Sequence, residues 1–161
     1  MLTAMDTLHT GGRSFAVTRA TVEDVPAIVA LLADDDLGRT RESPDLQPYL
    51  TAFAAIAADP RHLLVAVRDE SDAVVGTLQL TLLPGLSRAG ATRLQVEAVR
   101  IAPAARGAGL GTALLEWAHA YGRRRGATLA QLTTDKTRTA AHRFYERLGY
   151  RASHEGYKRP L

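Results

Sequence analysis

Cysteine, long apolar runs and aromatic residues are missing or scarce in this sequence. It has no cysteine among its 161 residues, which excludes disulfide bonds, thiolate nucleophiles and cysteine-ligated metals. No stretch reaches the roughly 18 consecutive apolar residues that predict a membrane-spanning helix. Aromatic residues make up 6% of the chain and fall at core-like spacings. We therefore expect no metal site, no membrane partner and no nucleic-acid partner.

The composition is that of one ordinary domain with a weakly basic balance. Hydrophobic residues make up 46% of the sequence, enough for one core, and the net charge is +3. The basic residues are scattered, although a nucleic-acid-binding protein stays a rival interpretation that salt-sensitive binding would support. We expect a single domain over residues 14–161, preceded by a flexible leader over residues 1–13. This leader lacks the apolar core of a signal peptide, so the expected location is the cytoplasm.

Apolar periodicity and breaker residues predict alternating strands and helices. The expected strands cover residues 15–19, 62–68, 73–83, 92–101, 129–134 and 150–157, and the expected helices cover residues 21–33, 46–58, 110–125 and 139–148. Residues 38–48 and 84–90 are expected to form loops. Hairpins combined with one strand–helix–strand crossover predict an α/β domain, with a mixed, mostly antiparallel sheet and helices on both faces.

A glycine-rich turn joins the expected strand over residues 92–101 to the helix that follows it. Arg106 comes first, followed by Gly107, Gly109 and Gly111 at alternate positions. Glycine lets a ligand approach the backbone closely, and the free N–H groups of a helix N-terminus favour an anion such as a diphosphate. A tight turn that only needs positive φ stays an alternative. The pattern lacks the Gly-Lys-Ser/Thr ending of a phosphate-binding loop and the early position of a dinucleotide fingerprint.

Two motifs resemble those of the GNAT superfamily of N-acetyltransferases. The spacing Arg106-x-x-Gly109-x-Gly111 resembles its motif A, Q/R-x-x-G-x-G/A, and residues 141–150 resemble its motif B, A-x-x-x-Y-E-x-x-G-F/Y. The resemblance covers about residues 15–161. It implies a GNAT-like fold, acetyl-CoA as co-substrate, and direct attack of an amine on the thioester in a ternary complex.

The same resemblance implies a set of cofactor-binding residues. Backbone groups of Val99 and Ile101 would bind the pantetheine arm as an added strand would. Backbone N–H groups would hold the pyrophosphate, and they come from Arg106, Gly107, Ala108, Gly109, Leu110, Gly111 and Thr112. The thioester would lie in a gap between residue 101 and the strand over residues 129–134. Arg138 stands where the family often has an asparagine, and it would meet either a phosphate or water.

Glu97 and Tyr145 are the candidate catalytic residues. An alkylamine with a pKa of about 10.4 is deprotonated in only about one molecule per thousand at pH 7.4, so a general base is needed. Glu97 shares a strand face with the expected cofactor track, counted by simple alternation with Val99 and Ile101. An ion pair with an arginine is the alternative. Tyr145, in motif B, is the candidate acid for the leaving thiolate, with a core aromatic role as the alternative. His142 stands three residues earlier, as a proton helper or a surface residue.

The acceptor is less defined than the cofactor. Arg39, Arg41 and Arg88 lie in segments expected to build the acceptor side, where they would bind an anionic group or remain solvated. The C-terminal stretch resembles the ending of aminoalkylphosphonate N-acetyltransferases. We expect a small polar or anionic amine as substrate. A non-catalytic acetyl-CoA sensor or partner module, a protein N-acetyltransferase and assembly as a homodimer stay open.

Overall fold

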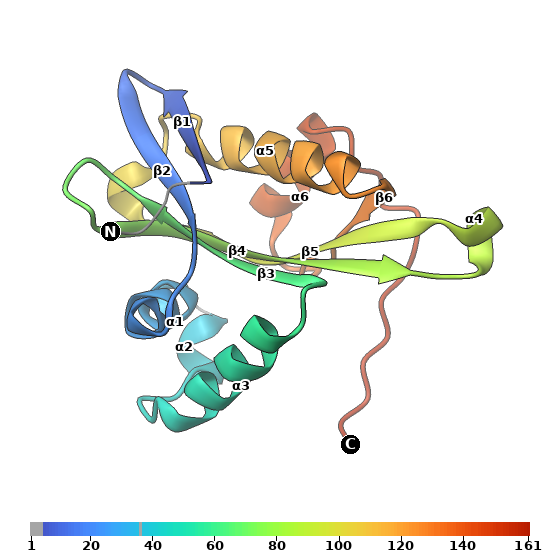
Figure 1. The fold of residues 1–161 in the computed structure, drawn as a ribbon, viewed down its shortest axis with the longest axis horizontal. Coiled ribbons are helices and arrows are strands. Elements are labelled where there is room, and N and C mark those ends of the chain that lie inside the picture. Colours follow the sequence, from blue (N-terminus) through green and yellow to red (C-terminus); the bar gives the residue numbers. More distant parts are fainter. Residues whose placement is uncertain (1–4, 36) are drawn as a thin grey trace.

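The chain forms one curled sheet with helices packed on both of its faces (Figure 1). The computed structural model describes residues 5–35 and 37–161. The strands are β1 (Asp6–Thr10), β2 (Arg13–Arg19), β3 (His62–Arg68), β4 (Val74–Pro84), β5 (Thr92–Ile101) and β6 (Ala127–Gln131). The helices are η1 (Val22–Asp24), α1 (Val25–Ala33), α2 (Gly38–Arg41), α3 (Gln47–Ala58), α4 (Ser87–Gly90), η2 (Pro103–Ala105), α5 (Leu110–Arg124) and α6 (Thr139–Arg147). Within the described ranges, no helix is both long and apolar enough to cross a membrane.

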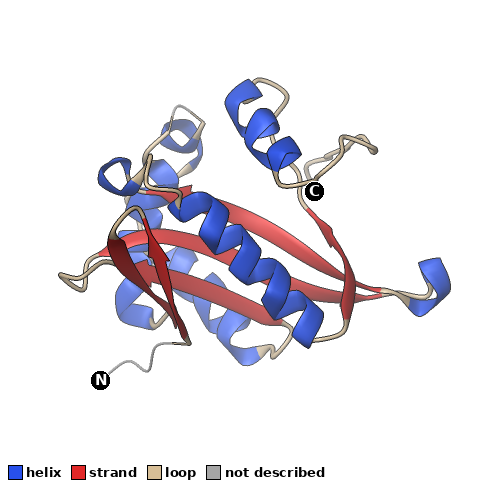
Figure 2. Ribbon diagram, turned by 90° about the horizontal axis from the view of Figure 1, so that it is seen from above, coloured by secondary structure: helices blue, strands red, loops and turns tan. Residues whose placement is uncertain are grey.

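The six strands lie side by side in sequence order, and every neighbouring pair is antiparallel except β5 and β6. A parallel pair needs a crossover connection, and α5 provides it. Helices α5 and α6 lie on one side of the sheet and α1, α2 and α3 on the other, with α5 running diagonally across the strands (Figures 1 and 2). The expected α/β class, with a mixed, mostly antiparallel sheet covered on both faces, is confirmed.

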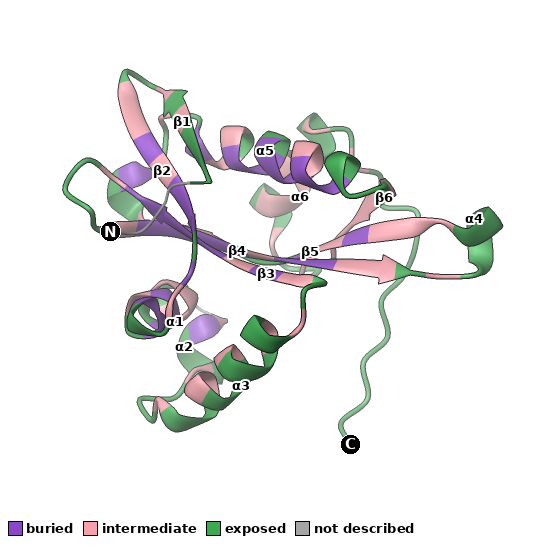
Figure 3. Ribbon diagram, viewed as in Figure 1, coloured by how far each residue is buried: buried purple, intermediate pink, exposed green. Residues whose placement is uncertain are grey.

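The main core lies between the sheet and α5, where buried residues line the facing surfaces (Figure 3). The apolar stripe predicted for α5 is buried at every position, namely Leu110, Leu114, Trp117, Ala118 and Tyr121. These side chains pack against β2, β3, β4 and β5 residues such as Phe15, Val65, Leu78 and Val96. Burial of each leucine, valine or phenylalanine side chain here stabilises the fold by about 1.5–3 kcal/mol. This packing fixes the N-terminus of α5 beside the end of β5.

The N-terminal residues differ from the expected leader. Strand β1 pairs with β2 through a two-residue turn at Gly11 and Gly12, which have φ values of 59° and 72°. Positive φ at both turn positions is typical of the tight hairpins that match the twist of a sheet, so this glycine pair is a hairpin turn. Leu8 packs against the core cluster. The leader interpretation is therefore wrong for residues 6–10, and residues 1–4 lie outside the described residues.

Three other segments depart from the sequence expectation. The expected strand over residues 150–157 is not formed, and this segment is irregular and largely exposed, with a local turn bond from the Ser153 N–H to the Arg151 carbonyl. The expected loop over residues 38–48 contains the short helix α2. The loop between β4 and β5 contains α4, where Arg88 and Ala89 have positive φ. Short polar segments of this kind have no strong periodicity from which to predict them.

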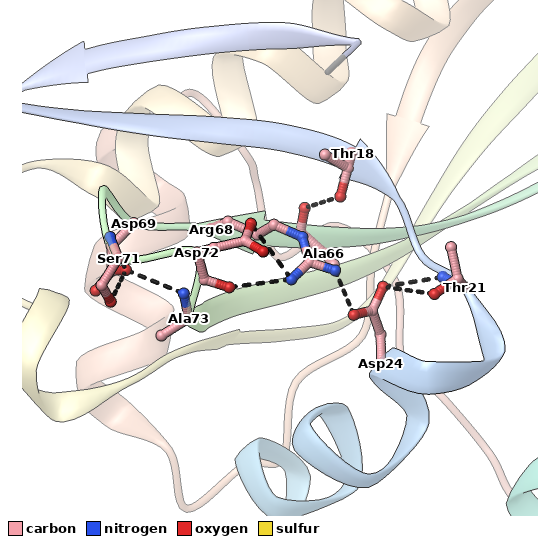
Figure 4. A network of polar contacts seen from close by, with 9 residues as sticks. All are labelled: Thr18, Thr21, Asp24, Ala66, Arg68, Asp69, Ser71, Asp72 and Ala73. Carbon is pink, nitrogen blue, oxygen red and sulfur yellow. Dashed lines mark hydrogen bonds and ion pairs between the residues drawn. The ribbon is translucent and has the colours of Figure 1, made fainter. Parts of the chain in front are cut away.

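A buried ion pair ties α1 to the sheet. Asp24 and Arg68, only 4% and 8% exposed, form a hydrogen-bonded salt bridge (Figure 4). The other oxygen of Asp24 accepts the Thr21 N–H at 2.9 Å, which completes a capping box at η1. Arg68 also donates to the Asp72 carbonyl at 3.1 Å. Each charge is thus compensated by its partner, and α1 begins at a fixed point on the sheet.

We expect Asp24→Ala to lower the free energy of unfolding by about 3–5 kcal/mol, because it leaves the Arg68 guanidinium buried without its counter-ion. Urea unfolding measures this loss. Asp72→Asn is the matched control, since Asp72 lies 3.7 Å from Arg68 but is 82% exposed, and its loss should stay below about 1 kcal/mol. Equal losses in the two variants would contradict this account of the ion pair.

Candidate functional site

The glycine-rich turn places free backbone donors at the N-terminus of α5. Gly109 is the N-cap residue, with φ of 79° in the left-handed region, and Gly107 has φ of 81°. The first backbone bond of the helix runs from the Ala113 N–H to the Gly109 carbonyl, so helix geometry leaves the N–H groups of the first turn without an intrahelical acceptor. The Arg106 N–H donates to the Pro103 carbonyl at 3.2 Å, which engages one of the expected donors.

Contacts from three directions hold this turn in place. The Arg106 side chain donates from Nε to the Ile101 carbonyl at 2.9 Å and lies 3.5 Å from Asp34. The Thr10 hydroxyl of β1 donates to the Ala108 carbonyl. A Cβ on Gly111 would lie 3.3 Å from the Phe144 ring, so glycine there lets α6 pack close to α5. The turn is therefore preorganised, which lowers the ordering cost of binding an anion.

A β-bulge interrupts β5 between Glu97 and Arg100. Ala98 has φ of 54°, and Glu97 pairs with Gln79 while Arg100 pairs with Thr77. Two residues of β5 thus oppose a single residue of β4, which shifts the side-chain alternation by one. Glu97 and Arg100 consequently share the face that α1 to α3 cover. The expectation that simple alternation continues from Glu97 through Ile101 is wrong.

Strands β5 and β6 part beyond one pair of glutamines. Their register ends at Gln95 opposite Gln131, where the Gln131 side-chain amide donates to Gln95 Oε1 at 2.6 Å. The rest of β5, through Ile101, has no β6 partner. Along this open edge the Val99 carbonyl accepts a bond from Arg100 and the Ile101 carbonyl one from Arg106, both at 2.9 Å. The open edge of β5 leads directly to the glycine-rich turn.

Glu97 is exposed on β5 beside the bulge. The ion pair considered from the sequence is absent among the described residues. Arg93 donates to Gln131 at 3.3 Å, and Arg100 lies 3.2 Å from Asp35. The Glu97 carboxylate is thus available to a ligand on the α1–α3 side of the sheet.

Tyr145 lies on α6 between aromatic neighbours. Its ring contacts those of Phe144 and Tyr150 edge-on, with centroids 5.2 and 5.8 Å away. Burial raises the pKa of its phenol, and the positive charges of Arg138 and Arg100 oppose this rise. The hydroxyl of the neighbouring Tyr150 forms a hydrogen bond with the His119 ring at 2.8 Å. Burial raises the pKa of Tyr150 to about 12.

An ion cluster of Asp35, Arg100 and Arg138 lies close to Tyr145. Asp35 Oδ2 lies 3.2 Å from Arg100 and 3.5 Å from Arg138, while Oδ1 accepts the Gly38 N–H at 2.6 Å. Burial alone would raise the pKa of Asp35, but the Gly38 bond and the two arginines together lower it. Burial lowers the pKa of Arg100 despite the opposing effect of Asp35.

This cluster borders an open pocket of about 270 Å³. Asp35, Leu37, Thr137 and Arg138 line it. Arg138 was expected to meet either a phosphate or water, and the structure gives it Asp35 as a partner. The sequence does not indicate Asp35 or Arg100 as site residues. Their ion pair depends on the bulge in β5 and on the fold of the segment after α1.

The arginines expected on the acceptor side do not all come together. Arg41 on α2 lies 3.8 Å from Asp135, while Arg88 lies in α4 at the far end of the β4–β5 hairpin, away from α2 in both views (Figures 1 and 2). Arg39 is exposed beside Arg41 on α2.

The His142 ring bonds with the Asp135 carbonyl at 2.8 Å, which ties α6 to the preceding turn. Within the described ranges, no group of three or more His, Asp or Glu side chains is arranged to hold a metal ion.

Comparisons with known proteins agree with the resemblance in the sequence. A family model described as acetyltransferase (GNAT) family matches residues 27–150. The aminoalkylphosphonate N-acetyltransferase of Salmonella typhimurium is 34% identical over 143 residues, covering 88% of each chain. A solved structure described as a transcriptional regulator from Bacillus halodurans has a TM-score of 0.86 and 42% identity, covering 91% of this chain and 99% of its own. A putative acetyltransferase from Agrobacterium tumefaciens has a TM-score of 0.78, 25% identity and the same coverage.

Proposed function

Because the chain belongs to the acetyltransferase (GNAT) family, we propose that it transfers the acetyl group of acetyl-CoA to the amine of a small polar or anionic molecule. The observation that carries this proposal is the preorganised turn from Arg106 to Gly109, which leads from the open edge of β5 into α5. The amine would attack the thioester directly in a ternary complex. The acceptor class is supported by the similarity to an aminoalkylphosphonate N-acetyltransferase.

The backbone around the turn has polar groups suited to the pyrophosphate and the pantetheine arm of acetyl-CoA. The N–H groups of Gly107 to Thr112 face the pyrophosphate in this proposal, where the helix dipole also favours negative charge. The open edge of β5 at Val99 and Ile101 would bind the pantetheine amides, because each carbonyl there keeps a second lone pair beside the bond from its arginine. Bound acetyl-CoA supplies the thioester, and the chain supplies orientation and proton transfer.

Glu97 and Tyr145 would perform the two proton transfers. Glu97, exposed beside the bulge, would take a proton from the attacking ammonium group directly or through water. Tyr145 would give its proton to the departing thiolate, and a raised pKa keeps the phenol protonated at neutral pH. Holding both reactants between these groups would contribute through orientation.

A panel of amines tests the proposed function. Release of coenzyme A is followed with aminoalkyl phosphonates, amino acids, amines without an anionic group, and peptides carrying free lysines and N-termini. Mass spectrometry identifies the products. Turnover of small polar or anionic amines is the expected result. Turnover of peptides far above every small amine would indicate a protein N-acetyltransferase. Binding of acetyl-CoA without turnover of any amine would indicate a sensor or partner module.

We expect Glu97→Gln to lower kcat/KM about 100-fold at neutral pH, the lower end of the range for a lost general base. The loss should be larger at pH 6 than at pH 9, because fewer amine molecules are already deprotonated at low pH. A pH series of initial rates measures it, with Glu155→Gln on the exposed C-terminal segment as the charge-matched control. A deficit that does not change with pH would argue against a base at this position.

A further inference from the structure

Arg100 and Arg138 converge on one carboxylate from separate elements. Arg100 follows the bulge in β5, and Arg138 is the N-cap residue of α6. Their guanidinium groups lie 3.2 and 3.5 Å from Asp35 Oδ2. Two like charges held this close repel each other, so the arrangement requires an anion between them. In this structure Asp35 provides that anion.

Asp35 compensates the two arginines only in part. Its Oδ2 atom is buried and within ion-pair distance, yet it has no hydrogen bond among the described residues, and neither has the buried Nε of Arg100. The other oxygen of Asp35 is held by the Gly38 N–H at 2.6 Å. A phosphonate has three acceptor oxygens, so it offers more bonds to two guanidinium groups than one carboxylate oxygen does.

A ligand can reach this cluster from the pocket. Arg138 is 37% exposed at its side chain while Arg100 is 19% exposed, and both Arg138 and Asp35 line the open cavity of about 270 Å³. An anion that enters would therefore meet Arg138 first. Arg100, held deeper by burial, stays as the fixed part of the cluster.

The bulge also sets the backbone spacing between Arg100 of the cluster and Glu97, the candidate base. Glu97 and Arg100 lie opposite Gln79 and Thr77, two positions apart on β4, which corresponds to about 7 Å along a strand. Both side chains lie on the same face of the sheet. A short acceptor, with its amine near Glu97 and its anionic group near the arginines, is compatible with this spacing of the two backbone positions.

We propose that Arg100 and Arg138 form the subsite for the anionic group of the acceptor, and that Asp35 is a built-in counter-ion which releases Arg138 when that group binds. The inference rests on the proposed function and deepens it. It assigns Arg138 to the acceptor and not to the cofactor. Asp35 then favours some acceptors over others, because a phosphonate, with three acceptor oxygens, displaces it from Arg138 more readily than a carboxylate does. An amine without an anionic group gains nothing at this subsite.

Binding of methylphosphonate tests the subsite without any reaction, because this probe has no amine. Titration calorimetry in the presence of coenzyme A should show about a 10- to 100-fold loss of affinity in Arg138→Gln, the range for a hydrogen bond to a charged group. Asp35→Asn should bind about two- to fivefold more tightly, since a partly exposed ion pair is released. Asparagine can still accept the Gly38 N–H, so the loop is retained. Asp59→Asn, a distant carboxylate paired with Arg61, is the charge-matched control and should not change the affinity.

Acceptor kinetics supply the second measurement. Arg138→Gln should raise KM for 2-aminoethylphosphonate but not for ethanolamine, which has no anionic group, with acetyl-CoA affinity unchanged. Arg138→Lys should restore part of the difference. Equal losses for both acceptors, or weaker methylphosphonate binding by Asp35→Asn, would overturn the proposal. Absence of turnover for every amine would contradict the proposed function alone, since the calorimetric result stands independently of it.

Discussion

Replacing Gly109 with aspartate is expected to lower the affinity for acetyl-CoA by at least about 100-fold. Two unit charges about 4 Å apart interact by about 4 kcal/mol near a protein surface, and the new carboxylate would face the pyrophosphate at the first turn of α5. Gly109 has φ of 79°, and a Cβ there would lie 2.8 Å from the Thr10 hydroxyl. The substitution thus adds both charge and bulk where the backbone must approach the ligand. Titration calorimetry with acetyl-CoA measures the loss.

Two further variants separate charge from strain in this experiment. Gly109→Asn has nearly the same shape without the charge, so it should lose much less affinity than Gly109→Asp. Gly126→Asp places the same residue in a similar left-handed conformation, with φ of 82° and open space around it, after the other end of α5. It should bind acetyl-CoA like the wild type, with circular dichroism confirming the fold of each variant. If Gly109→Asp bound normally, the main support for a pyrophosphate site at this turn would be lost.

Long segments with periodic apolar residues can be predicted from the sequence, because the apolar positions are the ones that the fold buries. The stripe of α5 from Leu110 to Tyr121 must face the sheet, since no other surface would exclude water from it. The glycine pair at residues 11 and 12 is a hairpin signal as well, but the strand before it, Asp6–Thr10, is short and polar and has little periodic pattern. The C-terminal segment shows the opposite error, where a weak alternation in residues 150–157 predicted a strand that is not formed.

Only those parts of the candidate site that lie within a short sequence motif could be predicted from the sequence. The glycine spacing that begins at Arg106 and the position of Tyr145 follow from short sequence patterns. The bulge does not, because alanine at position 98 gives no sign of a left-handed conformation, which glycine or asparagine would have suggested. The bulge at this residue changes which β5 side chains share a face of the sheet with Glu97. It places Arg100 on that face, within ion-pair distance of Asp35. Contacts of this kind depend on three separate elements and have no local signature.

Tyr145→Phe is expected to lower kcat by about 10²- to 10⁴-fold, the usual range for loss of a general acid or base. The change removes only the hydroxyl, so the edge-on contacts with Phe144 and Tyr150 should persist and the free energy of unfolding should change little. KM for either substrate should also change little, because the proton is given to the thiolate after both substrates have bound. Initial rates at saturating acetyl-CoA and acceptor measure the effect.

Tyr150→Phe is the matched control, because it removes a neighbouring phenol whose hydroxyl bonds with His119 at 2.8 Å. Its expected cost is about 1 kcal/mol of stability with kcat unchanged. The pH profile distinguishes an acid from a packing residue. Since burial raises the pKa of Tyr145 above its ordinary value, the phenol stays protonated from pH 6 to pH 9, roughly the range below its ordinary value of 10. The deficit of Tyr145→Phe should therefore be constant across that range. Wild-type kcat in Tyr145→Phe would show that another group, or water, protonates the leaving thiolate.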